Sequence, residues 1–325
     1  MVEQVSRQTE NLGIPWRSPM LIVILAVALM TPLDVPLISP VLPAIAAKFG
    51  VTESTAGLFV TLYALPGILL APVIGSLADR FGRRYVLAGC LTVFGVTGTA
   101  IAFTSDFTIA LGLRLAQGFA AGSLLSALAM TMVGDRYTGR QHDGVMGITS
   151  AMLSLGTAAY PIIGGYLAGR AWNAPFLMYA IPIPVAVMVL FGIDDRETTT
   201  ATSGRAYIRE AIRVIPTGRA VALYGVMFAS FGLMFGGLYT ALPFHLSRTF
   251  GLSSTIVGAI TSGVLVVTAL VSTQNGRIAA DMSIRSTLTT GFGLYASGFV
   301  IVALADGLWL LASGLLLIGV GSGLV

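Results

Sequence analysis

The sequence contains little charge, one cysteine and two histidines. Aspartate, glutamate, lysine and arginine together make up 10% of its 325 residues, against about a quarter in a typical soluble domain. The single cysteine, Cys90, lies in an apolar stretch, which excludes an intrachain disulfide and favours a packing role. His142 and His245 lie far apart, and neither has a second ligand at metal spacing, so we expect no metal site.

The sequence also lacks the signatures of an enzyme or of an ATP-driven pump. It has no P-loop and no paired carboxylates, and its Gly-Gly pairs lie within apolar stretches rather than at strand-to-helix turns. The net charge is +4, but the basic residues fall in short loops and form no continuous stripe, so nucleic acid is not an expected partner. Residues 1–18 have no apolar core of a cleaved signal peptide. We therefore expect no enzymatic activity and no cofactor.

Apolar residues are abundant, at 55% of the chain. They form stretches of about 18 to 28 residues, each long enough to cross a hydrocarbon core about 30 Å thick. Backbone polar groups in lipid must be paired within their own segment, so these stretches are predicted to be helices. The sequence predicts an all-α polytopic membrane protein with about ten spans, over residues 20–45, 55–78, 84–104, 107–134, 144–168, 174–193, 219–246, 253–274, 287–304 and 307–325.

The distribution of basic residues predicts the orientation of these spans. Cytoplasmic loops of membrane proteins carry an excess of lysine and arginine. If the N-terminus is cytoplasmic, 14 of the 18 lysines and arginines fall in inner segments. The outer loops hold only Lys48, Arg170 and Arg248, and Arg114 lies within a span. We predict a multi-pass protein of the plasma membrane with its N-terminus in the cytoplasm.

A long polar segment divides the spans into two groups. We predict a six-helix bundle over residues 1–193, a cytoplasmic linker with a short amphipathic helix over 194–218, and an incomplete bundle of helices 7–10 over 219–325. The second group repeats features of the first at an offset of 200 or 201 residues: Leu42-Pro43 and Leu242-Pro243, Phe49-Gly50 and Phe250-Gly251, Asp106 and Asp306, and Gly118…Gly122 and Gly319…Gly323. Two parallel repeats of this kind are typical of one transporter architecture.

Three motifs lie within the first group. Gly75-Ser-Leu-Ala-Asp-Arg-Phe-Gly-Arg-Arg84 resembles, almost position for position, the loop between helices 2 and 3 of the major facilitator superfamily. Arg114-Leu-Ala-Gln117-Gly118 resembles the helix-4 pattern of that family. Gly156-Thr-Ala-Ala-Tyr160-Pro161-Ile-Ile-Gly164-Gly165 resembles its helix-5 antiporter motif, with Tyr160 where the family usually has glycine. The chain is thus similar to the drug:proton antiporter branch of the family.

The resemblance implies roles for the loop and helix-5 motifs. In the loop, Gly82 permits a turn with positive φ and Asp79 can accept hydrogen bonds from a helix N-terminus. The implied gating clasp comprises Gly75, Asp79, Arg80, Gly82, Arg83, Arg84 and, at the inner end of helix 4, Asp135. The implied bend of helix 5 against helix 8 uses Gly156, Pro161, Gly164 and Gly165. The alternatives are a topological anchor for the arginines and ordinary small-residue packing for the glycines.

Only Asp34 and Arg114 place an ionisable side chain within a span. At 1.5 Å per residue, Asp34 lies about 9 Å and Arg114 about 10 Å from the same membrane boundary. We predict that they face each other, with Gln117 beside them, and that Arg114 keeps Asp34 ionised until a proton or a cationic substrate competes. The alternative is a permanent ion pair that fixes two helices. Pro32, Pro36 and Pro40 flank Asp34, and we expect them to break the helical ladder and to allow a cavity beside it. Tyr63 is a candidate for lining a cavity, although aromatic residues at helical spacing more often pack against other helices or face lipid.

These features favour a monomeric secondary active transporter that exports small drug-like or amphiphilic compounds in exchange for protons by alternating access. Its partners would be a small-molecule substrate, protons and the lipid bilayer. Uptake of a sugar or metabolite by proton symport is also open. The repeat length predicts a second bundle ending near residue 394, so the chain as given is expected to lack helices 11 and 12, which leaves a non-transporting remnant as a further alternative.

Overall fold

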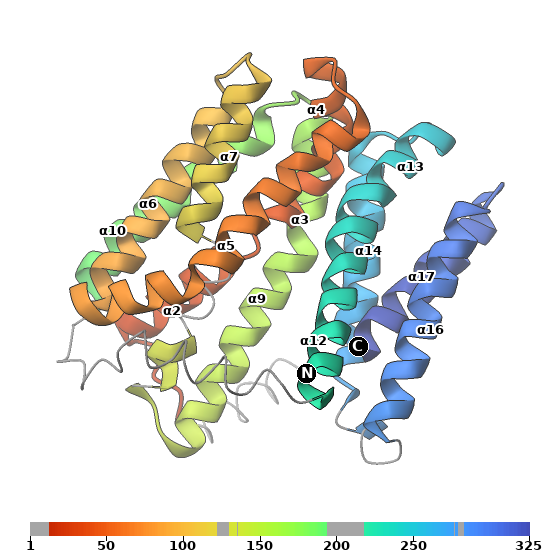
Figure 1. The fold of residues 1–325 in the computed structure, drawn as a ribbon. Coiled ribbons are helices and arrows are strands. Elements are labelled where there is room, and N and C mark those ends of the chain that lie inside the picture. The colour runs from red at the N-terminus through yellow and green to blue at the C-terminus, as the bar shows by residue number, and fades with distance from the viewer. Residues whose placement is uncertain (1–12, 122–129, 135, 194–217, 276, 279–282) are drawn as a thin grey trace. The chain divides into compact units, whose positions relative to one another are not determined.

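A computed structural model describes residues 13–121, 130–134, 136–193, 218–275, 277–278 and 283–325, and every regular element among them is a helix (Figure 1). The all-α expectation is confirmed for this part of the chain. Contacts between residues divide the chain into two compact units. The first unit takes the described parts of Met1–Asp34, Ser54–Gly156 and Asn173–Ile215, and the second takes Val35–Glu53, Thr157–Trp172 and the described parts of Pro216–Val325.

The first unit is built around one central helix. Its elements are α2 (Pro19–Met30), α5 (Glu53–Phe81, apart from Glu53), α6 (Arg83–Ile101), α7 (Phe107–Ala121), the first part of α9 (Gly139–Ala168), η2 (Ala174–Ala180) and α10 (Pro182–Gly192). Helix α6 packs against α7, η2 and α10, and α10 packs against α2. Fully buried aromatic rings of Phe59, Phe94, Phe176 and Tyr179 fill the space between these helices.

The second unit packs segments from both groups of predicted spans against one another. Its elements are α3 (Val35–Ile38), η1 (Ser39–Val41), α4 (Leu42–Phe49), the last part of α9, α12 (Gly218–Phe231), the π-helical η3 (Gly232–Ala241), α13 (Leu242–Phe250), α14 (Ser254–Ser272), α16 (Ile284–Ala303) and α17 (Leu308–Leu324). Helix α17 packs against α16 and α14, while η1 contacts α13, α14 and η3. The boundaries predicted at residues 193 and 218 remain a prediction, and residues 194–217 lie outside the described part of the chain.

The first predicted span is interrupted. One span was predicted over residues 20–45, with prolines beside Asp34 that break the helical ladder. In the structure α2 ends at Met30, a turn follows over residues 31–34, and α3 begins at Val35. The two helical parts, Pro19–Met30 and Val35–Phe49, are bent by 42° at this break. Pro32 and Pro36 account for the interruption, because neither can donate the backbone hydrogen bond that a continuous helix needs.

The repeated sequence pairs adopt the same local structure. Leu42 begins α4, and its counterpart Leu242 begins α13. Gly50 ends α4 with φ of 63°, and Gly251 ends α13 with φ of 62°. Both are left-handed C-caps, a conformation that glycine adopts without steric cost. The repeat seen in the sequence therefore extends to the way these two helices begin and end.

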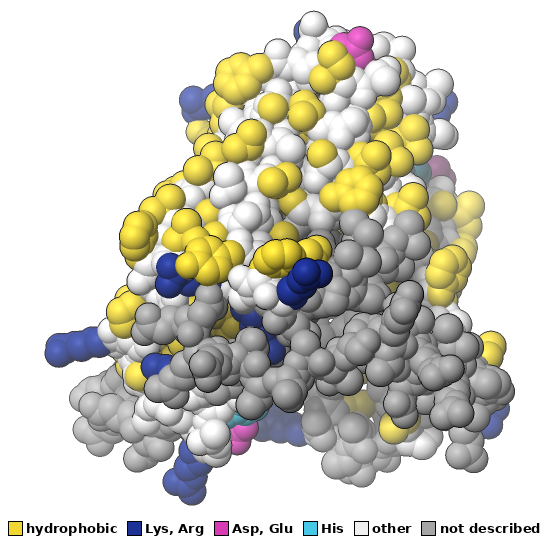
Figure 2. All heavy atoms as spheres, turned by 60° about the vertical axis from the view of Figure 1, so that its left-hand side comes forward, with side chains coloured by type: hydrophobic (Ala, Val, Ile, Leu, Met, Phe, Trp, Pro, Cys, Tyr) yellow, Lys and Arg dark blue, Asp and Glu magenta, His cyan; other side chains and the backbone are white. Residues whose placement is uncertain are grey.

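Six helices in the described part of the chain are long and apolar enough to cross a membrane, and a seventh span results if the bent pair counts as one. Shorter apolar helices cover Phe107–Ala120 and Leu308–Leu324. Many large apolar side chains are exposed, among them Phe191 and Trp309, and Figure 2 shows such side chains spread over one face. Soluble monomers rarely expose so much contiguous apolar surface. The exact number of ten spans remains a prediction.

The contact between α16 and α17 leads to a stability prediction. A Cβ atom on Gly298 would lie 2.8 Å from the carbonyl oxygen of Gly314 and 2.8 Å from the backbone nitrogen of Ile318. Replacing Gly298 with alanine should lower the free energy of unfolding by about 1–3 kcal/mol, because the two helices must move apart. Denaturation of the detergent-solubilised protein, followed by circular dichroism, measures this change.

Gly293 provides the matched control, because it lies on the same helix and a Cβ atom there would have no neighbour within 4 Å. Gly293→Ala should leave the protein equally stable or stabilise it by up to about 1 kcal/mol, since alanine is the better helix former. Equal effects of the two substitutions would show that α16 and α17 do not pack at Gly298.

Candidate functional site

Arg114 on α7 is fully buried, although its guanidinium group carries a charge. Its Nε donates a hydrogen bond to the carbonyl oxygen of Phe59 at 2.9 Å. Its Nη1 donates to Gln117 Oε1 at 2.6 Å and to the hydroxyl of Tyr179 at 3.1 Å. The ring of Tyr63 lies 4.5 Å from the guanidinium carbon, close enough for a cation–π contact. Nη2 is buried and has no hydrogen-bond partner among the described residues.

Gln117 completes the surroundings of Arg114 from the next turn of α7. Besides accepting from Arg114, its side chain donates through Nε2 to the carbonyl oxygen of Phe94 on α6 at 3.3 Å. Residues three apart on a helix share a face, which explains how one motif supplies both side chains. Gly98 on α6 leaves the room they need, since a Cβ there would overlap Gln117 Nε2 and the ring of Tyr179. Gln117 therefore lies beside Arg114, as predicted.

Asp34 lies at the end of the break between α2 and α3. Its backbone carbonyl accepts a hydrogen bond from the hydroxyl of Tyr179 at 3.1 Å. Its side chain accepts one from the hydroxyl of Tyr63. Both tyrosines also contact Arg114. The structure thus brings Asp34 and Arg114 to the same two tyrosines, and the direct pairing of the two side chains stays a prediction.

The two tyrosines were not predicted as site residues. The sequence left Tyr63 open between cavity lining and packing. Tyr179 lies in an apolar stretch far along the chain from Asp34 and Arg114, so nothing beside it indicates these partners. A signal was present, however: buried tyrosines usually find a hydrogen-bond partner for the hydroxyl group. A tyrosine within a predicted span is therefore a candidate partner for an ionisable residue at the same depth.

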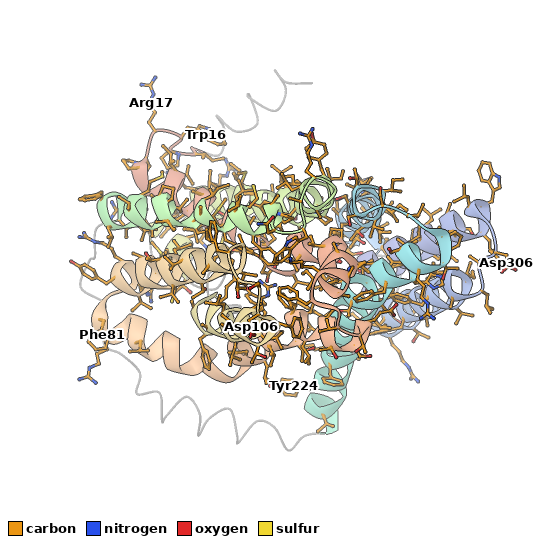
Figure 3. The ribbon with its side chains drawn as sticks, turned by 90° about the horizontal axis from the view of Figure 1, so that it is seen from above. Trp16, Arg17, Phe81, Asp106, Tyr224 and Asp306 are labelled. Carbon is orange, nitrogen blue, oxygen red and sulfur yellow. The ribbon has the colours of Figure 1, made fainter. Side chains whose placement is uncertain are left out.

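The loop motif forms a turn of one residue. Helix α5 ends at Phe81 and α6 begins at Arg83, and Gly82 between them has φ of 89°, as its sequence position predicted. Arg84 Nη1 donates to the carbonyl oxygen of Ile193, which caps the C-terminus of α10, at 3.2 Å. A positive group is favourable at the negative end of a helix. Phe81 points outward at this turn, and Asp106 lies at the start of α7 (Figure 3).

The predicted gating clasp is described only in part. The exposed guanidinium of Arg80 lies 5.4 Å from the ring centre of Phe81, and Arg83 begins α6. The side chains of Gly75 and Asp79 and the whole of Asp135 lie outside the described residues. The clasp therefore stays a prediction.

The helix-5 motif lies in the second unit from Thr157 onward, where α9 packs closely on α14 and α3. A Cβ on Gly165 would overlap the carbonyl oxygen of Ser254, and a Cβ on Gly258 would overlap that of Pro161. Gly164 lies against the backbone of Leu37 in the same way. We call the α9–α14 contact the glycine seam. Small-residue packing, the alternative for these glycines, is present, and α9 runs continuously through Pro161 from the buried Gly156. The implied bend against helix 8 stays a prediction.

Hydrogen bonds cross the glycine seam as well. The backbone nitrogen of Ile162 donates to Ser262 Oγ at 3.0 Å, and Thr255 Oγ1 donates to the carbonyl oxygen of Gly165 at 3.3 Å. A serine or threonine hydroxyl can break and re-form such bonds cheaply compared with a charged pair. The seam is thus a close contact whose polar part is weak enough to separate.

The sequence is similar to that of known membrane transporters. The sequence model of one family, the Major Facilitator Superfamily, matches residues 24–325. The class B tetracycline resistance protein of Escherichia coli is 27% identical over 293 residues, which cover 88% of this chain and 73% of that protein. The bacillibactin exporter of Bacillus subtilis is 32% identical over 164 residues, which cover 48% of this chain and 40% of the exporter.

A solved structure supports the fold. The crystal structure of a D-xylose-proton symporter superposes with a TM-score of 0.70 at 20% identity, covering 94% of this chain and 80% of that one. At this identity the likeness concerns the fold alone. It agrees with an arrangement of helices that the sequence repeat and the described elements both indicate.

The glycine seam yields a prediction that needs no knowledge of function. A Cβ on Gly169 would lie 2.7 Å from Thr255 Oγ1, so cysteines at these two positions should oxidise readily in a protein whose Cys90 has been replaced by serine. Adding Gly258→Leu should abolish this disulfide, because the larger side chain forces α9 and α14 apart. Alkylation of the thiols that remain after oxidation, counted by mass spectrometry, measures the effect.

Gly263→Leu is the control, because Gly263 lies on the same helix with nothing within 4 Å of an added Cβ. The control should leave disulfide formation unchanged. Efficient oxidation in the Gly258→Leu protein would show that the seam does not form as described.

Proposed function

This chain belongs to the Major Facilitator Superfamily and is a multi-pass membrane transporter, and we propose that it exports small drug-like or amphiphilic compounds in exchange for protons. One observation carries the coupling part of the proposal. Asp34, at a helix break within a span, shares two tyrosines with the buried cation Arg114. An acidic group inside a membrane protein is costly unless it serves a proton or substrate pathway.

The export direction is supported by the names of the relatives. One is a tetracycline resistance protein and another is an exporter of bacillibactin. The alignments cover 73% and 40% of these two proteins, so their activities reach this chain only as a proposal. Protons entering the cell release energy that an exporter can use, and Asp34 would take up and release that proton.

Alternating access would involve the glycine seam. Within the second unit, the last part of α9 belongs to the first group of spans and α14 belongs to the second. If the two groups rock against each other around a central site, this contact must open and close once in each cycle. The absence of side chains on Gly165 and Gly258 and the weak hydroxyl hydrogen bonds both suit a contact that separates repeatedly.

We place the protein in the plasma membrane as a monomer, with a cytoplasmic N-terminus that follows from its basic loops. The loop from Gly75 to Arg84 would lie on the cytoplasmic side. Arg84, bound to the end of α10, would hold the first unit together there while the other clasp residues open and close.

Transport by purified protein in liposomes tests the proposal. With an imposed pH gradient, ethidium or tetracycline should accumulate in vesicles while an internal pH dye reports proton movement in the opposite direction, and nigericin should abolish both. Asp34→Asn should slow this exchange by about tenfold or more, the factor that corresponds to losing about 1.4 kcal/mol of transition-state stabilisation.

Asp106→Asn is the matched control, because it makes the same chemical change on the surface. Asp106 Oδ1 caps α7 by accepting from the backbone nitrogens of Thr108 and Ile109 at 2.7 and 3.0 Å, and asparagine caps a helix equally well. The control should transport at the wild-type rate. Unchanged proton-driven exchange in the Asp34→Asn protein would overturn the coupling role.

A further inference from the structure

The contacts around Asp34 assign a specific task to its two tyrosine neighbours. We propose that Tyr63 and Tyr179 are positioning residues that relay the charge state of Asp34 to Arg114. The inference rests on the proposed proton exchange for its place in transport, but the relay itself is a property of four side chains in the first unit. Hydrogen bonds and a ring contact connect these four side chains.

The hydroxyl of Tyr179 uses both of its hydrogen-bonding functions. It donates its proton to the carbonyl oxygen of Asp34 and accepts one from Arg114 Nη1, each at 3.1 Å. The ring is fully buried and packs edge-on against Phe94, with ring centres 5.3 Å apart. A Cβ on Gly98 would overlap it, so the site is closely fitted to this ring. Because the hydroxyl has a single proton, the direction of its O–H bond depends on the carbonyl oxygen of Asp34 and on Arg114 Nη1.

Tyr63 joins the same two residues by a different route. Its hydroxyl donates to the side chain of Asp34. Its ring face lies 4.5 Å from the guanidinium carbon of Arg114. The side chain is almost completely buried, and its carbonyl oxygen lies where a Cβ of Gly118 would be. The hydroxyl of Tyr63 therefore contacts the carboxylate of Asp34, and the face of its ring contacts the guanidinium group of Arg114.

Protonation of Asp34 would change both routes. A hydrogen bond to a carboxylate is roughly twice as strong as one to a neutral acceptor, so uptake of a proton weakens the bond from Tyr63. The turn at residues 31–34 is then free to shift, which moves the carbonyl oxygen that holds the Tyr179 proton. Arg114 loses part of its support on two sides. Its Nη2 group, buried without a partner among the described residues, is then available to a new acceptor.

The charged and titratable groups described around Asp34 are few. Arg114 lies on α7, Tyr63 on α5 and Tyr179 on η2, and electrostatic interactions connect them to Asp34 and to one another. An ion pair between Asp34 and Arg114 would need neither hydroxyl group to sense a proton. A relay needs both, and this difference makes the two tyrosines separately testable.

Phenylalanine substitutions separate the hydroxyl groups from the rings. Tyr63→Phe keeps the cation–π contact and removes the bond to Asp34, and Tyr179→Phe keeps the ring packing and removes the bridge to Arg114. Tyr137→Phe is the matched control, because the Tyr137 hydroxyl is buried without a hydrogen-bond partner among the described residues. Each of the three substitutions removes one buried hydroxyl group and leaves the aromatic ring in place.

Infrared difference spectroscopy of the full chain in lipid, titrated with acid, reads the relay without transport. The carboxylic acid band that disappears in Asp34→Asn identifies the proton on Asp34, and the guanidinium bands that disappear in Arg114→Gln identify Arg114. In the wild type both signals should change with one midpoint. In Tyr63→Phe the carboxyl midpoint should move to higher pH, because an ionised carboxylate that loses a donor binds protons more readily.

In Tyr179→Phe the carboxyl band should still titrate, but the guanidinium bands should no longer change with it. Tyr137→Phe should reproduce the wild type in both signals. The relay is overturned if both phenylalanine variants in the site titrate like the wild type, or if Tyr137→Phe shifts them equally. If Tyr179→Phe does not fold, the carboxyl midpoint of Tyr63→Phe alone tests the relay, because Tyr63→Phe keeps the ring of residue 63 and its packing.

The same variants measured in liposomes separate this inference from the proposed function. The midpoint of the pH profile of ethidium–proton exchange should shift upward in Tyr63→Phe and stay unchanged in Tyr137→Phe. Coupled infrared signals in a wild-type protein that moves no protons would refute proton exchange and leave the relay intact. Unaltered infrared titrations in a protein that exchanges ethidium for protons would refute the relay alone.

Discussion

The buried charge of Arg114 constrains more of this structure than any other single group. Moving an ion out of water costs several kcal/mol unless hydrogen bonds and opposite charges replace the lost solvent. Four groups supply that replacement: the carbonyl of Phe59 on α5, Gln117 on α7, Tyr179 on η2 and the ring of Tyr63. The helices of the first unit must approach closely enough to bring these groups together.

Glycines make that approach possible, and they do the same in the second unit. In lipid, helices gain little from the hydrophobic effect and associate through close packing instead. Gly98 admits Gln117 and Tyr179 to the surroundings of Arg114, whereas Gly165 and Gly258 bring α9 onto α14. The first case surrounds a charge and encloses it tightly. The second joins two apolar surfaces through weak hydroxyl bonds, so it is the contact better suited to repeated opening.

The sequence predicted what depends on local chemistry. Glycine at position 82 permits the one-residue turn, prolines interrupt the first span, and the rise of a helix puts Asp34 and Arg114 at one depth. It did not predict Tyr179, whose hydroxyl reaches a carbonyl 145 residues away in the chain. Nothing near Tyr179 in the sequence specifies that partner, because the approach of η2 to the broken helix depends on how α6 packs against its neighbours.

The hydrogen bonding of Arg114 leaves one of its terminal nitrogens able to bind a further acceptor. A guanidinium group has five N–H donors. In this state Nε and Nη1 are engaged, while Nη2 has no hydrogen-bond partner among the described residues. Most buried polar groups in proteins have a hydrogen-bond partner, so Nη2 has the capacity to donate to one more acceptor. The carboxylate of Asp34, which contacts the same two tyrosines as Arg114, has the negative charge that suits such an acceptor.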